Sequence, residues 1–274
     1  MRFSVITVCW NSEKALPRAM ASLSNQRFKD YEWIVVDGAS TDGTLSIVRS
    51  FSSAPLTVIS EPDQGIYDAM NKGVAEARGD YIFFLNSDDM LHDENVLEDV
   101  SRWLEMNPGT DFLYGNVVNV KADGSWLRHF EHITRHNIIE DGICHQAIFA
   151  TRMLFTTIGM FDLRFRINAD YDWMLRVFLS RTRCAYLDRR FAFFFDGGAH
   201  VLDKTYTAKE RETVRLQYTE RHWLALHLLR ARVFNRLHRI IRGHARGVSR
   251  IAGEPPELIE LIDSSKVTLE VKNT

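Results

Sequence analysis

Residues 81–89 read YIFFLNSDD, an apolar run that changes at once into polar residues. A short, nearly continuous apolar run is typical of a strand covered on both faces, as strands are in the middle of a parallel sheet. Polar side chains directly after such a strand lie at the carboxyl edge of the sheet, where ligands bind in α/β proteins. The stretch therefore predicts a central strand at 81–86 whose polar end, 86–89, lies at a ligand-binding edge.

The same pattern repeats on the N-terminal side. Short β-branched or aromatic runs predict strands at 3–9, 32–37 and 56–60, and the spacing of apolar residues predicts helices at 13–25, 44–51 and 66–78. Strands that alternate with helices form βαβ units. We therefore expect an α/β fold with helices on both faces of a mainly parallel central sheet.

Two more loops follow predicted strands, at 10–12 and 37–44. Parallel strands all end at the same edge, so these loops and residues 86–89 are expected to meet there. Asp37 is well placed to accept a hydrogen bond from a ligand N–H group, and Gly38 permits close approach of the backbone. For Asp42 the better interpretation is structural, at the start of a helix.

Asp88 and Asp89 are adjacent carboxylates that repel each other and contribute nothing to packing. A hard divalent cation resolves that repulsion, because carboxylate oxygens are ligands that Mg²⁺ and Mn²⁺ prefer. The competing interpretation is that one of the two caps the next helix. The pair thus predicts a metal site, with helix capping as the alternative.

The pattern changes after Asp89. Helical spacing at 93–106 and 170–181, a hairpin of 112–120 with 125–130, and an aromatic core run at 191–195 follow. We expect one domain over 1–203, divided into halves at 1–89 and 90–203. A basic amphipathic helical appendage at 204–253 and a short tail at 254–274 complete the chain.

Composition excludes several classes of protein. The 274 residues carry 34 Lys and Arg against 36 Asp and Glu, so the chain lacks the basic bias of a general nucleic-acid binder. Cys9, Cys144 and Cys184 are scattered and odd in number, which favours reduced thiols in the cytoplasm over a disulfide framework. The first residues are typical of a strand and show no signal-peptide pattern.

Four motifs occur in order along the chain. They are SVITV with Asn11, VVDGASTDGT at 35–44, DQGIYDAMNKG at 63–73 and GDYIFFLNSDD at 79–89. Together they resemble the successive motifs of family 2 glycosyltransferases, especially bacterial members that build surface polysaccharides, over roughly residues 3–200. The resemblance implies a GT-A fold, an inverting mechanism and a nucleotide-diphosphate sugar donor held with a divalent metal, Mn²⁺ or Mg²⁺.

The resemblance also implies roles for residues of the 1–89 half. Asp37 matches the carboxylate that reads the base, usually uracil, and Thr7 lies in the strand beneath it. Asn86-Ser87-Asp88 matches the Asp-x-Asp metal motif, but Asn86 replaces the first acid, which shifts coordination of the metal to Asp88 with Asp89 beside it. Asp68, Asn71 and Lys72 lie on one side of a predicted helix, from which one or two of them can reach this edge. The other residues expected to bind the donor are Asn11, Asp68 and Lys72.

The general base is expected in NADYDW at 168–173, where the family has Glu-Asp-x-Asp. The residue carried over as base is Asp170, because an acceptor hydroxyl is a weak nucleophile that a positioned carboxylate activates. Ala169 replaces the family's Glu. Both Asp170 and Asp172 begin a helix, where the dipole favours negative charge, and for Asp172 this structural role is the better interpretation.

Two histidines are further candidates. His145-Gln146 resembles a pair near the acceptor in this branch of the family, with a satisfied structural histidine as the alternative. His200 follows Gly197-Gly198 in a loop that can close over the diphosphate, where it is a candidate contact for metal or phosphate.

These expectations describe a cytoplasmic hexosyl- or N-acetylhexosaminyltransferase. It moves a sugar, with inversion, from a nucleotide-diphosphate donor, UDP being the expected nucleotide, to a hydroxyl of a glycan or lipid-linked acceptor. The 1–89 half holds the donor and the 90–203 half faces the acceptor. A nucleotidyltransferase needs a Gly-rich basic phosphate loop that residues 10–13 do not supply. An inactive nucleotide-sugar-binding or scaffold module stays open, because Asn86 and Ala169 replace acids.

The segment 205–250 holds eleven Lys and Arg against three Glu. Arginines interrupt its apolar spacing every few residues, so it cannot span a bilayer, which needs about 20 apolar residues. It can lie on an anionic membrane surface, at about 1 kcal/mol of attraction per basic residue, which predicts peripheral attachment at the inner face of the plasma membrane. The alternative is that its apolar face packs on the catalytic domain or a second subunit.

Overall fold

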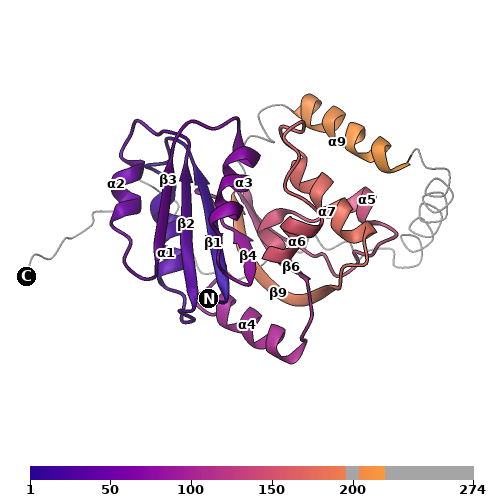
Figure 1. Ribbon diagram of the computed structural model, residues 1–274, viewed down its shortest axis with the longest axis horizontal. Helices are drawn as coiled ribbons and strands as arrows, with labels where there is room; N and C mark the ends of the chain where they lie inside the picture. The colour runs from indigo at the N-terminus through magenta and orange to yellow at the C-terminus, as the bar shows by residue number, and fades with distance from the viewer. Residues whose placement is uncertain (196–203, 220–274) are drawn as a thin grey trace, which may run out of the picture.

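Nine strands form one sheet within residues 1–195 and 204–219, the part of the chain that the computed structural model describes (Figure 1). The strands are β1 (Phe3–Cys9), β2 (Tyr31–Asp37), β3 (Leu56–Ser60), β4 (Tyr81–Phe84), β5 (Met90–Leu91), β6 (Phe112–Lys121), β7 (Gly124–Arg128), β8 (Ile148–Thr151) and β9 (Cys184–Phe195). The helices are α1 (Leu16–Ser24), α2 (Thr44–Arg49), α3 (Ile66–Glu76), α4 (Val96–Met106), α5 (Ile138–Asp141), the 3₁₀ turn η1 (His145–Ala147), α6 (Arg152–Thr157), α7 (Ala169–Leu179) and α9 (Lys204–Thr219).

The sheet has two halves that differ in strand direction. Its order is β3-β2-β1-β4-β8-β6-β9-β5, with β7 paired to β6. β3, β2, β1 and β4 are parallel, whereas β8 runs antiparallel to both of its neighbours, β4 and β6. The expected α/β architecture is confirmed, with the parallel strands concentrated in the N-terminal half and a mixed arrangement beyond β4.

The reversed direction of β8 positions the candidate site. β1, β2 and β4 end at one edge of the sheet, and the antiparallel β8 begins at that edge. η1 immediately precedes β8, so it lies beside the turn that follows β4. His145, in η1, is thereby brought next to Asn86 in the predicted metal motif, although 59 positions separate the two residues along the chain.

Three of the parallel strands, β1, β2 and β4, are buried on both faces, as their apolar sequences require. Every residue of β1, β2 and β4 is buried. α3 covers one face and approaches it closely, because a Cβ atom on Gly73 would lie only 2.5 Å from the Ile6 side chain. This packing holds the N-terminal end of α3, and the loop before it, against the carboxyl edge of the sheet.

Several predicted boundaries shift by a few residues, and three of the shifts lie near the candidate site. The helix predicted at 13–25 begins at Leu16, because residues 12–15 form a turn and Pro17 fits only the first helical turn. The strand predicted at 81–86 ends at Phe84, after which Asn86 begins a turn closed by a hydrogen bond from Asp89 N to Asn86 O. The helix predicted at 66–78 ends at Glu76, where Ala77 is extended.

Part of the predicted basic appendage is described as α9. In Figure 1 this helix lies beside α7, away from β2 and β3, and its Val214 is fully buried. His200, residues 220–253 and the tail at 254–274 lie outside the described residues. None of the helices in residues 1–195 and 204–219 has the length and apolar character needed to cross a membrane.

Candidate active site

Hydrogen bonds tie the loop after β1 to the loop after β2. Asn11 Oδ1 accepts a hydrogen bond from Thr41 N at 2.9 Å, and Asn11 N donates to Ser40 Oγ at 2.7 Å. Asn11 and Ala39 have φ angles of 47° and 59°, in the left-handed region that non-glycine residues rarely adopt. Strained backbone of this kind in two facing loops is common at ligand-binding sites.

Asp37 and Thr7 lie beneath these loops. Asp37 is fully buried, and its carboxylate accepts hydrogen bonds from Ser40 N at 3.0 Å, from Ser40 Oγ, and from Ser60 Oγ at 2.7 Å. Thr7 is also fully buried, and its Oγ1 accepts a hydrogen bond from Trp33 Nε1 at 2.9 Å. Asp37 therefore holds the loop after β2, whereas Thr7 joins β1 to β2 within the sheet.

Trp10 is a residue to which motif reasoning assigned no role. Its side chain is 68% exposed, and its Cβ lies 3.5 Å from the position that a Cβ on Gly38 would take. An aromatic face at a binding edge can stack on a planar ring such as a nucleobase. The signal in the sequence was an aromatic residue directly after a buried strand at this edge.

Asp68 and Lys72 are held by the loop before α3. Lys72 Nζ contacts Glu61 Oε1 at 2.8 Å and Asp68 Oδ2 at 3.5 Å, and it donates to Pro62 O at 3.0 Å. Asp68 Oδ2 also accepts a hydrogen bond from Gln64 N at 2.9 Å. The two residues thus fix residues 61–65 in place.

Asn71, the third candidate on this helix, faces elsewhere. It exchanges two hydrogen bonds of 3.0 Å with the backbone of Phe161, in the loop before α7. Asn71 therefore links α3 to the loop before α7, in the 90–203 half of the chain.

The turn at residues 86–89, which contains the predicted metal ligand Asp88 and is called the metal-motif turn below, contacts the loop after β1 and helix α1. Ser87 Oγ lies 3.1 Å from Ser12 Oγ, and the Arg18 guanidinium donates to Asp88 O at 2.5 Å. The same guanidinium lies 3.6 Å from the centre of the Phe195 ring. These contacts fix the backbone of the turn and leave the Asp88 carboxylate partly exposed, with no side-chain hydrogen bond to residues 1–195 or 204–219.

Asp89 differs from its neighbour. It is fully buried, and its carboxylate accepts hydrogen bonds from Gln146 Nε2 at 2.8 Å and from Phe195 N at 3.2 Å. Burial, and then the negative charge of Asp88, raises the pKa of Asp89 to about 7. Asp89 thus holds the turn against η1 and the end of β9.

The oxygen atoms around this turn fit a hard divalent cation. Asp88 supplies a carboxylate that is partly exposed, and Asn86 Oδ1 is buried without a hydrogen-bond partner in the described residues. Within residues 1–195 and 204–219 no group of three or more His, Cys, Asp or Glu side chains could share a metal. That is compatible with Mg²⁺, which commonly takes only one or two protein carboxylates and completes its shell with water and phosphate oxygens.

A continuous chain of hydrogen bonds leads from the metal-motif turn to the predicted base. Asn86 Nδ2 lies 3.0 Å from His145 Nε2, and His145 Nδ1 lies 2.9 Å from Asp170 Oδ2. The Tyr67 hydroxyl oxygen lies 2.8 Å from Asp170 Oδ1 and 2.6 Å from Ile167 O, and its single hydrogen is shared between these two acceptors. The four side chains come from the turn after β4, from η1, from α7 and from α3.

These contacts keep Asp170 ionised. Burial acts to raise the pKa of Asp170, but hydrogen bonds from His145 and Tyr67, together with one from Tyr171 N, bring it below the usual value for an aspartate. The carboxyl side chain is still 21% exposed. Asp170 is thus a fixed carboxylate that a ligand can reach.

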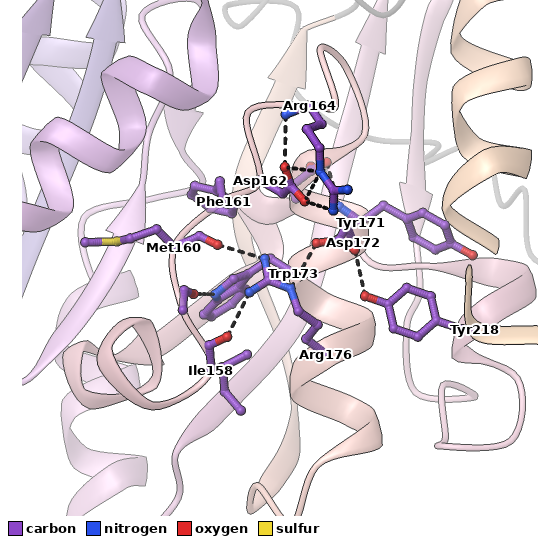
Figure 2. A network of polar contacts seen from close by, with 12 residues as sticks. Ile158, Met160, Phe161, Asp162, Arg164, Tyr171, Asp172, Trp173, Arg176 and Tyr218 are labelled. Carbon is purple, nitrogen blue, oxygen red and sulfur yellow. Dashed lines mark hydrogen bonds and ion pairs between the residues drawn. The ribbon is translucent and has the colours of Figure 1, made fainter. Parts of the chain in front are cut away.

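Asp172, two residues along the same helix, faces a different set of partners (Figure 2). Its carboxylate accepts hydrogen bonds from Arg176 Nε at 2.9 Å and from Tyr218 O–H at 2.6 Å. Arg176 also donates to the carbonyl oxygens of Ile158 and Met160. The side chain of Asp172 is buried in this network, which confirms the expected structural role.

Asp42 has the structural role at the start of a helix that the sequence predicts. Its Oδ1 accepts a hydrogen bond from Thr44 N at 3.0 Å, and its Oδ2 accepts one from Glu13 N at 3.1 Å. Asp42 therefore stabilises the start of α2 and joins it to the loop after β1.

Comparison with known proteins agrees with this geometry. Residues 4–172 match the family described as glycosyl transferase family 2. The chain belongs to this family. It is 37% identical over 179 residues, 64% of its length, to the PGL/p-HBAD biosynthesis glycosyltransferases of Mycobacterium tuberculosis and Mycobacterium bovis, covering 69% of those proteins.

Solved structures share the fold of this glycosyltransferase. The S. aureus TarS fragment 1–349 in complex with UDP-GlcNAc superposes with a TM-score of 0.62 at 21% identity, over 80% of this chain and 67% of that one. The chain spans only 44% of the longer TarS structure. A mannosyltransferase from Pyrobaculum calidifontis in complex with GDP-Man and Mn²⁺ has a TM-score of 0.55 at 16% identity, over 95% and 78% of the two chains. The expected GT-A fold is confirmed.

Proposed function

We propose that this chain transfers a sugar, with inversion, from a nucleotide-diphosphate donor, UDP-linked, to a hydroxyl of a glycan or lipid-linked acceptor. The observation that carries the proposal is the chain of hydrogen bonds from Asn86 through His145 to Asp170. It places an ionised carboxylate beside the turn that bears Asp88, as a transfer reaction between a bound diphosphate sugar and a hydroxyl requires.

The donor would lie across the loops after β1, β2 and β4. The exposed Trp10 offers a face for the nucleobase. Asp37 and Asn11 bond to the two loops that contain the left-handed residues, Thr7 joins β1 to β2 beneath them, and Asp68 with Lys72 holds the neighbouring loop 61–65. We assign these five residues to the donor site chiefly as supports of its backbone.

Asp88 and the Oδ1 atom of Asn86 are the groups that would hold a divalent cation, with Asp89 fixing the turn behind them. When bound, the cation supplies positive charge that stabilises the diphosphate as it leaves. The preference of Mg²⁺ and Mn²⁺ for oxygen ligands fits this set.

Asp170 would act on the acceptor. Its carboxylate takes the proton of the acceptor hydroxyl as the hydroxyl oxygen attacks the anomeric carbon of the donor sugar. The bond between that carbon and the diphosphate oxygen breaks on the opposite face, so the configuration inverts. His145 and Tyr67 hold two different oxygens of Asp170, so the carboxylate cannot rotate away from the hydroxyl.

A catalytically inactive module on the same fold is the rival proposal, since Asn86 and Ala169 replace acids of the family pattern. Incubation with UDP-glucose, UDP-N-acetylglucosamine and GDP-mannose, each with Mn²⁺, separates the two by release of free nucleotide. The enzyme proposal predicts release from at least one donor and a loss of that release in Asp170→Asn. Tight nucleotide binding without release from any donor, in the presence of candidate acceptors, favours the inactive module.

Cytoplasmic location is a further proposal, and so is attachment to an anionic membrane through residues 205–250. Because α9 (Lys204–Thr219) packs on α7, the test removes the part of the chain after Thr219. Sedimentation with phosphatidylglycerol vesicles tests attachment. Salt-sensitive binding that is lost on truncation after Thr219 supports it, and the absence of binding by the intact chain rules it out. Truncation at this point leaves α9 in place, which keeps the catalytic domain comparable.

A further inference from the structure

Helix α9 buries a carboxylate against the segment that leads into α7. Glu210 is only 8% exposed. Its carboxylate accepts hydrogen bonds from the backbone N–H groups of Arg166 at 2.6 Å, Ile167 at 2.8 Å and Asn168 at 2.8 Å, and from Asn168 Nδ2 at 3.0 Å. More than 40 residues of chain separate Glu210 from these donors, so the contact exists only in the folded protein.

The start of α7 explains why a carboxylate binds there. The three backbone N–H groups belong to residues 166–168, which precede α7 and have no partner within that helix, and the helix dipole favours negative charge at its N-terminal end. Asn168, the N-cap residue directly before α7, makes no capping hydrogen bond with its own side chain. Burial acts to raise the pKa of Glu210, but the hydrogen bonds from residues 166–168 lower it, so Glu210 is ionised.

The segment that Glu210 holds also positions Asp170. Ile167 donates its N–H to Glu210 and accepts the Tyr67 hydroxyl hydrogen at its carbonyl oxygen. The same hydroxyl donates to Asp170 Oδ1. The backbone immediately before Asp170 is therefore held from one side by α9 and from the other by α3.

Two more contacts attach α9 to the first turn of α7. The Arg211 guanidinium lies 4.0 Å from the centre of the Tyr171 ring, and the Tyr218 hydroxyl donates to Asp172. α9 thus contacts the residues on both sides of Asp170.

We propose that Glu210 is a positioning residue for Asp170, so that α9 is a working part of the acceptor side of the active site. The proposal rests on the proposed function, in which Asp170 is the base. Glu210 itself does not touch substrate. It sets the backbone from which the base projects, and its loss changes the rate of transfer without changing donor binding.

The test compares Glu210→Gln with Glu212→Gln, the same change two residues along α9. Glu212 is exposed and pairs with Arg215 on its own helix. The rate measured is nucleotide release from the donor that the wild-type chain turns over fastest, well below the melting temperature of each variant. We expect Glu210→Gln to lower kcat about tenfold with the donor KM unchanged, and Glu212→Gln to match the wild type.

A double mutant separates positioning from general support of the fold. If Glu210 acts through Asp170, adding Glu210→Gln to Asp170→Asn causes little further loss of rate. An equal loss in both backgrounds, or a wild-type kcat in Glu210→Gln, overturns the proposal. If Glu210→Gln does not fold, Asn168→Ala, which removes the side-chain bonds to Glu210 and Thr207 O, is expected to show a smaller loss of the same kind, and a wild-type kcat overturns the proposal.

Failure of the proposed function gives a different result. In that case the wild-type chain releases no nucleotide from any donor, or Asp170→Asn is as active as the wild type. If the wild type is active and Asp170→Asn is not, a wild-type rate in Glu210→Gln disproves the positioning role alone.

Discussion

The donor edge and the acceptor side of the site are built from contacts of different range. On the donor edge, Asn11 contacts residues about 30 positions away, in the loop after the neighbouring parallel strand. On the acceptor side, Tyr67 reaches Asp170 across 103 positions and Asn71 reaches Phe161 across 90. The donor edge therefore follows from local motifs and parallel topology, whereas the geometry of the base depends on three elements that meet only in the folded chain.

The largest effect on the rate is expected from a substitution of Asp88, on the donor edge. Asp88→Asn removes the one carboxylate that we assign to the cation. The charge stabilisation that the cation supplies is several kcal/mol, which corresponds to about 10⁴-fold in rate. Metal-dependent nucleotide release should therefore fall about 10⁴-fold, and calorimetry with UDP and Mn²⁺ should show no metal-dependent binding.

Asp42→Asn is the matched control for this change, because Asp42 lies at the same edge and caps α2. It should retain metal-dependent binding of UDP. Binding by Asp88→Asn that equals the wild type contradicts the assignment of the cation to Asp88.

The next largest effect is expected from a substitution of Asp170, which changes the acceptor side and leaves the donor edge intact. Asp170→Asn should lower transfer by about 10²–10⁴-fold, the usual contribution of a general base, with the affinity for UDP and Mn²⁺ unchanged. Asp172→Asn should instead lower the melting temperature, since it weakens a buried ion pair with Arg176. Full activity in Asp170→Asn together with loss in Asp172→Asn would reverse the two roles.

A smaller effect is expected from a substitution of Tyr67, and it is seen in the pH dependence of kcat. Tyr67→Phe keeps the aromatic ring and removes the hydroxyl that lowers the pKa of Asp170. The pKa of Asp170 should rise, so the base becomes protonated at a higher pH and the acid limb of the kcat profile moves to higher pH. At neutral pH the rate should fall by less than about tenfold. An acid limb that does not move would show that Tyr67 does not influence the base.

The smallest effect is on stability. The pKa of Glu210 lies below the usual 4.5 in the folded chain, so its contribution to stability is full above about pH 4.5 and is lost as the pH falls through the folded-state value. Glu210→Gln should lower the free energy of unfolding by about 1–3 kcal/mol at pH 7 and by less at pH 3. Urea unfolding at the two pH values measures the difference, and an equal loss at both contradicts an ionised Glu210.

The same contrast explains what the sequence could predict. The apolar composition of YIFFL predicts its burial, and the alternation of strands with helices predicts that β1, β2 and β4 are parallel. These two predictions correctly placed residues 86–89 beside the loop after β1. The mixed half was less predictable, because the direction of β8 depends on its pairing with β4 and β6. Glu210 carried no signal at all, since one glutamate in a basic helical segment does not reveal which backbone N–H groups it will meet.

Side-chain burial also separated neighbours that look alike in sequence. Asp88 and Asp89 both follow the apolar strand, yet only Asp89 is fully buried and bonded to Gln146. Asp170 and Asp172 both begin α7, but one faces His145 and the other Arg176. These differences depend on which distant element packs on each side, which spacing along the chain does not specify.

The central claim is that this family 2 glycosyltransferase uses the two sides together, with donor and cation at Asp88 and the base at Asp170. The most direct measurement is nucleotide release from UDP-glucose, UDP-N-acetylglucosamine and GDP-mannose by the wild-type chain, with Mn²⁺ and with Mn²⁺ removed by chelation. The account predicts release from at least one donor that stops on chelation and returns when Mn²⁺ is restored. Folded protein that neither binds nor turns over any of the three donors, or turnover that chelation leaves unchanged, would contradict it.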